Sequence, residues 1–117
     1  MHIKHVVYGF SLALIVSYNA VAFAYDPYDC LNDAVKADST IPVGLATRLC
    51  AAAWSPEPAK CYQNASLTDS TIPRFIAVDL CAGSVSSDRT LECYAKSSDR
   101  KLNRGLATSL CGAKKLN

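Results

Sequence analysis

Histidine is nearly absent from this 117-residue sequence, and its only two copies are His2 and His5. Both fall in a segment that we expect to be removed, so the mature chain has no imidazole. Without imidazole there is no Ser-His-Asp or Cys-His nucleophile, no histidine metal ligand, and no ordinary side chain that titrates near neutral pH. We therefore expect a protein that is not an enzyme and that uses no cofactor.

Long apolar runs are absent beyond the first residues. Residues 1–24 have the form of a secretory signal, with Lys4 before an apolar stretch at 6–16 and small residues at 22 and 24. An uncleaved anchor is the alternative, but polar residues at 17–19 end the run before the ~20 residues that a span needs. We expect cleavage after Ala24, with Ala22 as a second possible position, and a secreted or periplasmic product formed by one small domain at 25–117.

Closely spaced cysteines are absent too. The nearest pair, Cys50 and Cys61, has ten residues between its members, whereas zinc knuckles and thioredoxin-like sites need two to four. The spacing therefore argues against a metal site and against a redox site. In an exported chain, six cysteines favour disulfides instead.

What the sequence does have is an internal repeat. The six cysteines bound three copies of one unit, at 30–50, 61–81 and 93–111. An aspartate, three larger apolar residues and an alanine recur at matching distances before the second cysteine of each copy. These are Asp38, Ile41, Leu45, Ala46 and Leu49, then Asp69, Ile72, Ile76, Ala77 and Leu80, then Asp99, Leu102, Leu106, Ala107 and Leu110.

The spacing of these apolar residues is helical. Ile41, Leu45 and Leu49 lie four residues apart, which places them on one face of a helix. The first half of each copy, beginning at its first cysteine, has weaker helical character. We therefore predict an all-α fold of three short disulfide-closed αα-hairpin repeats, stacked as a small solenoid or, less favoured, as a compact bundle. Asp38 and its equivalents are interpreted as caps of the second helix, with proline in its first turn in the first two copies and Asn103 in place of that proline in the third.

Hairpin geometry also predicts the disulfides. Antiparallel packing brings the first and last residues of a copy to the same end, so we expect Cys30–Cys50, Cys61–Cys81 and Cys93–Cys111. Small residues such as Ala34, Ala46, Ala65 and Ala77 would permit the required approach within about 7 Å. The main rival links Cys50 to Cys61, Cys81 to Cys93 and Cys30 to Cys111, and sequence alone does not choose between them.

Charge is balanced overall but unevenly spread. Without Lys4, eleven Lys and Arg face ten Asp and Glu, a net charge of +1, but residues 85–117 hold seven bases and three acids. A solvated surface explains this better than a nucleic-acid site, because only Tyr94 interleaves the charges. We expect no nucleic-acid partner. Arg100, Lys101 and Arg104 are kept as candidate binding residues for an anionic membrane, a minor hypothesis.

Three aromatic residues bear on packing or on binding. Trp54, the only tryptophan, is interpreted first as a wedge between the first two hairpins, and second as an exposed binding residue for a partner. Tyr62 and Tyr94 follow the first cysteine of their copies where Leu31 stands in the first copy. Exchange with leucine indicates packing.

The repeat favours an exported, non-catalytic binding or scaffold module with a protein partner, because stacked hairpins expose an extended face without reactive residues. The alternative is a small secreted effector, inhibitor or toxin acting on a protein or membrane target, with the loop at 55–58 entering a cleft. An enzyme that uses carboxylates alone has no positive feature in its favour.

Overall fold

Residues 24–113 are described by the computed structural model, and the predicted signal at 1–24 lies almost entirely outside them. The described part is all-α, with six α-helices, one 3-10 helix and no strand. The helices are α2 (Pro27–Ala37), α3 (Val43–Cys50), α4 (Glu57–Thr68), α5 (Arg74–Cys81), α6 (Ser87–Ala95), η1 (Lys96–Arg100) and α7 (Arg104–Cys111).

The three predicted disulfides are present, and the rival pairing is not. Cys30–Cys50, Cys61–Cys81 and Cys93–Cys111 join the two helices of each copy, with Cα–Cα distances of 5.5, 5.4 and 5.7 Å. Alanines at 34, 46, 65, 77 and 107 are all buried beside them, at 3% exposure or less. Small side chains thus let the helices approach closely enough for a bridge.

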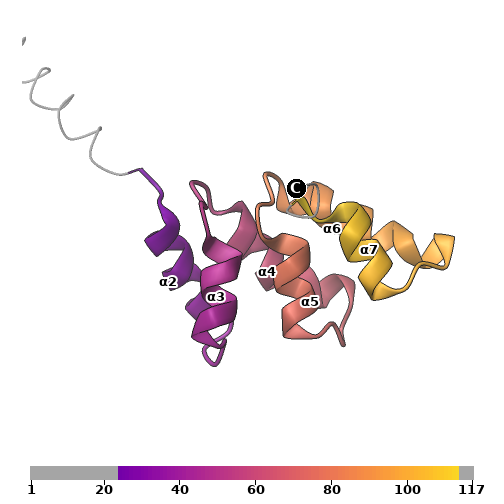
Figure 1. The fold of residues 1–117 in the computed structure, drawn as a ribbon, viewed down its shortest axis with the longest axis horizontal. Coiled ribbons are helices and arrows are strands. Elements are labelled where there is room, and N and C mark those ends of the chain that lie inside the picture. The colour runs from indigo at the N-terminus through magenta and orange to yellow at the C-terminus, as the bar shows by residue number, and fades with distance from the viewer. Residues whose placement is uncertain (1–23, 114–117) are drawn as a thin grey trace, which may run out of the picture.

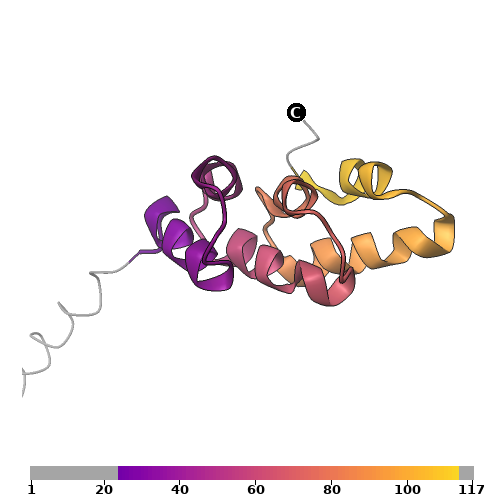
Figure 2. The same ribbon diagram turned by 90° about the horizontal axis from the view of Figure 1, so that it is seen from below.

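The helices lie in two layers. The first helices of the copies form one layer, with α4 packed against both α2 and α6, and the second helices form the other, with α5 packed against α3 and α7 (Figure 2). The three hairpins consequently lie in a row, with the first and third copies at its ends (Figure 1). Leu49, Val78 and Leu80 are fully buried between the layers and, with the cysteines and alanines, form most of the core.

The first helix of each copy begins earlier than predicted. α2, α4 and α6 start at Pro27, Glu57 and Ser87, all before the first cysteine of their copies. Asp26 accepts hydrogen bonds from the backbone at the start of α2, and Ser86 does the same for α6. These caps lie outside the repeated cysteine frame, which is why the repeat pattern did not reveal them.

The predicted capping role of Asp38 and Asp69 is wrong. The second helices begin after Pro42 and Pro73, which make no side-chain cap, and each aspartate instead ends the preceding helix. The prediction is wrong for Asp99 as well, because Asp99 lies within η1 and the cap of α7 is Asn103, whose side chain accepts from the N–H of Leu106 at 2.9 Å.

Candidate functional site

The loops between hairpins place apolar side chains in solvent at equivalent positions. Each loop turns through a left-handed residue two positions after the cysteine, Ala52 with φ 55° and Gly83 with φ 78°. The next residue is buried in both loops. The residue after that, Trp54 in the first loop and Val85 in the second, is 70% and 87% exposed. We call the edge formed by loops 51–56 and 82–86 the loop edge (Figure 1).

The favoured interpretation of Trp54 as a buried wedge is wrong. The small residue before it, Ala53, takes the buried place at 4% exposure, so the indole remains outside the core. A tryptophan this exposed offers a large apolar surface and an N–H donor to a partner. The second interpretation, a binding residue, therefore fits its position.

The basic candidates of the third copy separate into two groups. Arg100 and Lys101 are exposed at the end of η1, where Lys101 adopts a left-handed φ of 58°. Arg104 is instead held by acceptors of the second copy, as described below. Its guanidinium is thus part of a contact between hairpins and is not a free member of a basic patch.

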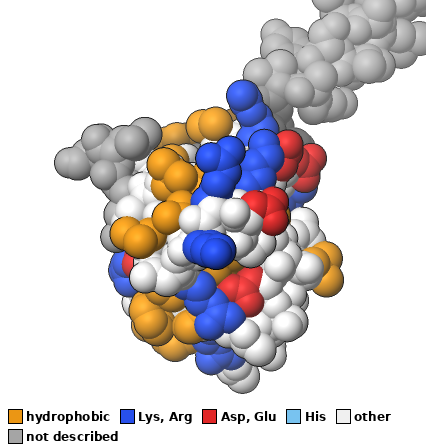
Figure 3. Space-filling model, turned by 90° about the vertical axis from the view of Figure 1, so that its right-hand side faces the viewer, with side chains coloured by type: hydrophobic (Ala, Val, Ile, Leu, Met, Phe, Trp, Pro, Cys, Tyr) orange, Lys and Arg blue, Asp and Glu red, His pale blue; other side chains and the backbone are white. Residues whose placement is uncertain are grey.

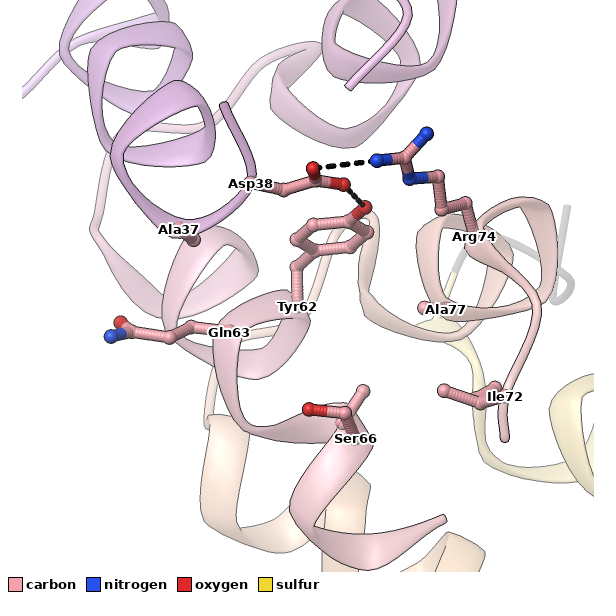
Figure 4. Close-up of a pocket in the computed structure, with 9 residues that line it drawn as sticks. Ala37, Asp38, Tyr62, Gln63, Ser66, Ile72, Arg74 and Ala77 are labelled. Atoms are coloured by element: carbon pink, nitrogen blue, oxygen red, sulfur yellow. Dashed lines mark hydrogen bonds and ion pairs between the residues drawn. The ribbon is translucent and has the colours of Figure 1, made fainter. Parts of the chain in front are cut away.

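A partly buried carboxylate contact joins the first and second hairpins (Figure 4). Asp38 accepts from the Tyr62 hydroxyl at 2.6 Å and from the Arg74 guanidinium at 2.8 Å, and Arg74 also donates to Thr40. Partial burial acts to raise the pKa of Asp38, but the hydrogen bonds from Tyr62 and Arg74 outweigh it, so the pKa lies below its ordinary value. We call this set the first carboxylate joint.

The same arrangement recurs one repeat later as the second carboxylate joint. Asp69 accepts from the Tyr94 hydroxyl at 2.7 Å and from Arg104 through two hydrogen bonds of 2.7 Å each. These bonds from Arg104, with the one from Tyr94, hold the pKa of Asp69 far below its ordinary value despite partial burial. The bidentate geometry makes this joint the stronger of the two.

Burial and the hydrogen bond to a carboxylate raise the pKa of both tyrosines to about 12. Tyr62 and Tyr94 are 8% and 5% exposed, as the prediction of packing requires, but their hydroxyls have a polar role that the prediction lacked. The sequence does hold a signal for it. Tyrosine and arginine occur together in the second and third copies, and Leu31 and Val43 replace both in the first copy, which no other hairpin precedes among residues 24–113.

Each joint borders a small open cavity, of about 220 Å³ at the first and about 300 Å³ at the second. Tyr62, Arg74 and Ile72 line the first cavity with small residues around them. The carboxylate at each cavity is ionised near neutral pH and already bound by donors. It is therefore poorly suited to general acid or base catalysis, which needs a pKa close to the working pH.

All six cysteines are in disulfides, so none supplies a thiolate to a metal. Within residues 24–113, no group of three or more His, Cys, Asp or Glu side chains is placed to hold a metal ion. None of the helices in this range combines the length and apolar character that crossing a bilayer requires. Three disulfides in a small helical domain fit an extracellular location.

Comparison with known proteins yields no relative. No family model, no curated protein and no solved structure matches this chain.

Proposed function

We propose that this protein is an exported, non-catalytic binding module, secreted or periplasmic, whose three hairpins form a short solenoid. The observation that carries the proposal is the loop edge, where Trp54 and Val85 are 70% and 87% exposed at equivalent positions. Disulfides within each hairpin and carboxylate joints between hairpins support a stiff frame, so the loops lose little conformational freedom on binding. Exposed aromatic side chains on rigid supports are typical of protein-binding surfaces.

The partner we propose is a protein with an apolar pocket that accepts the indole. Trp54 is the largest exposed side chain of the loop edge, and truncation of such an anchor commonly costs about 2 kcal/mol or more, roughly a thirtyfold loss of affinity. Val85 lies one repeat away and adds a second, smaller apolar contact.

The inhibitor-loop alternative has less support than the binding module. Glu57 and Pro58 belong to the first turn of α4 and not to a free loop, and Pro58 is buried. Glu57 also accepts from the backbone N–H of Ser87 at 2.9 Å. A segment tied down in this way is unsuited to insertion into a cleft.

The experiment is affinity capture from the native extracellular or periplasmic fraction, with the oxidised mature protein as bait. Trp54→Ala bait tests the loop edge, and Leu67→Ala is the matched control, because Leu67 is 84% exposed near the opposite end of α4. We expect a partner that the wild-type and Leu67→Ala baits retain and the Trp54→Ala bait loses. Equal capture by all three baits, or by none, would contradict the proposal.

A further inference from the structure

The third hairpin leaves open an apolar position that the other two hairpins bury. Leu49 and Leu80, each one residue before the second cysteine of its copy, are 0% exposed, and the equivalent Leu110 is 69% exposed. In the first two copies a following hairpin packs against this layer, since α5 lies on α3 and α7 lies on α5. Leu106, one turn earlier in α7, is 55% exposed as well. The end of the row thus continues the internal packing surface.

The opposite end of the row is also apolar. In the later copies, the side that faces the preceding hairpin carries the tyrosine and arginine of the carboxylate joint. The first copy has Leu31 and Val43 at these positions, and Val43 is 80% exposed. Terminal repeats that serve as caps in soluble repeat proteins have polar outer faces. Exposed Val43 at one end, and Leu106 and Leu110 at the other, depart from that description.

Both halves of the carboxylate joint are missing where the two ends would meet. The first copy lacks the donors, and the third copy lacks a placed acceptor because its turn is built differently. Its Leu102 N–H bonds to the Ser97 carbonyl at 3.0 Å, and Asp99 lies exposed within η1. A contact between the two ends would therefore bury apolar groups and leave no carboxylate or guanidinium of such a joint unpaired. An unpaired buried charge of that kind would be costly.

Charge disfavours contact between two third-copy ends. Lys96 and Arg100 of η1, and Lys101 directly after it, are exposed at the third-copy end, where Figure 3 shows basic side chains beside hydrophobic ones. The first helix of the first copy carries Asp29 and Asp33 next to its capping Asp26, but Asp33 lines a groove with Ala59 and Lys60 of the second hairpin and so does not lie on the open end. Two basic ends facing each other repel, which favours contact between unlike ends.

We propose that this chain associates head to tail with a second copy of itself, the first hairpin of one copy packing on the third hairpin of the next. The packing would follow the internal joints, with Leu110 and Leu106 set against Leu31 and Val43. Because the two contacting surfaces differ, each added copy leaves one end free. Such an interface produces filaments, or rings where the rotation closes.

The test is the molar mass of the oxidised mature protein, measured by light scattering or sedimentation from about 10 µM to about 1 mM, the range of weak self-association. We expect mass to rise with concentration. Leu110→Glu and Val43→Lys each alter one exposed end residue and should each weaken self-association at least about tenfold, with unchanged circular dichroism. Leu67→Lys, on α4 of the middle hairpin, is the matched control, because Leu67 is 84% exposed away from both ends, and it should associate as the wild type does.

A mixture of the two end variants decides the geometry. In head-to-tail packing, the intact third hairpin of the Val43→Lys protein accepts the intact first hairpin of the Leu110→Glu protein, so the mixture forms a dimer and stops there. A Val43→Lys protein that self-associates normally would indicate tail-to-tail packing and overturn the proposal. A wild-type protein that stays monomeric up to about 1 mM would overturn it as well.

Discussion

Replacing Tyr94 with phenylalanine tests whether the carboxylate joints hold the hairpins together. The substitution removes one hydroxyl that donates to Asp69 at 2.7 Å and leaves the buried ring in place. A hydrogen bond to a charged group contributes about 1.5–3 kcal/mol. The side chain of Asp69 remains 18% exposed and keeps its bonds from Arg104, so water and arginine compensate for part of the loss. We therefore expect Tyr94→Phe to lower the free energy of unfolding by about 1.5–2 kcal/mol.

The assay is urea unfolding of the oxidised protein at pH 7, followed by far-ultraviolet circular dichroism. Tyr28→Phe is the matched control, because Tyr28 is 75% exposed, and surface changes of this kind stay within about 0.5 kcal/mol. A double-mutant cycle with Asp69→Asn should give a coupling energy of about 1 kcal/mol or more, since the two groups share one hydrogen bond.

The pH dependence supplies an independent check with a definite sign. Because the folded pKa of Asp69 is lowered, its contribution is present above the unfolded value near 3.9 and is lost as pH falls through the folded pKa. The folded pKa of Tyr94 is raised to about 12, so its contribution is complete below about 10 and is lost as pH rises through 12. A Tyr94→Phe penalty no larger than that of Tyr28→Phe, or one that does not decline at these extremes, would refute the reasoning.

Three further outcomes follow from local geometry and can be measured by the same unfolding assay. Gly112→Ala should destabilise the protein by about 1–3 kcal/mol, because an added Cβ would lie 2.7 Å from the Thr108 carbonyl oxygen. Gly44→Ala, where nothing lies within 4 Å of the added Cβ, should be neutral or stabilising by up to about 1 kcal/mol. Equal changes in the free energy of unfolding for the two variants would contradict this expectation. Ala52→Gly should stabilise by about 0.5–1 kcal/mol, because its φ of 55° disfavours a Cβ, and a loss of stability would count against that strain. Adding reductant without denaturant should abolish the helical circular dichroism signal, because each disulfide closes a loop of 18 or 20 residues and contributes ~3 kcal/mol. A reduced protein that keeps this signal would show that the disulfides are dispensable for folding.

The carboxylate joints show what pattern analysis of one copy at a time misses. Asp38 precedes a helix by a few residues, and such residues commonly cap, so its local context favoured a cap. Its hydrogen bonds to Tyr62 and Arg74 span 24 and 36 residues. Only a comparison of neighbouring copies would have indicated the contact. In that comparison a tyrosine and an arginine appear together in one copy, and the aspartate lies in the copy before it.

Helical character and the hairpin units were predictable from the sequence alone, and hairpin geometry favoured the observed cysteine pairing without excluding the rival one. They depend on spacing within about twenty residues, where apolar periodicity and the antiparallel return of the chain leave few alternatives. The tertiary structure decided where Asp38 and Asp69 find their donors and that Trp54 stays in solvent. It also decided that Leu110 ends the row uncovered. These outcomes depend on how neighbouring hairpins are arranged and on which loop residue is buried. A local sequence pattern specifies neither the arrangement nor the buried residue.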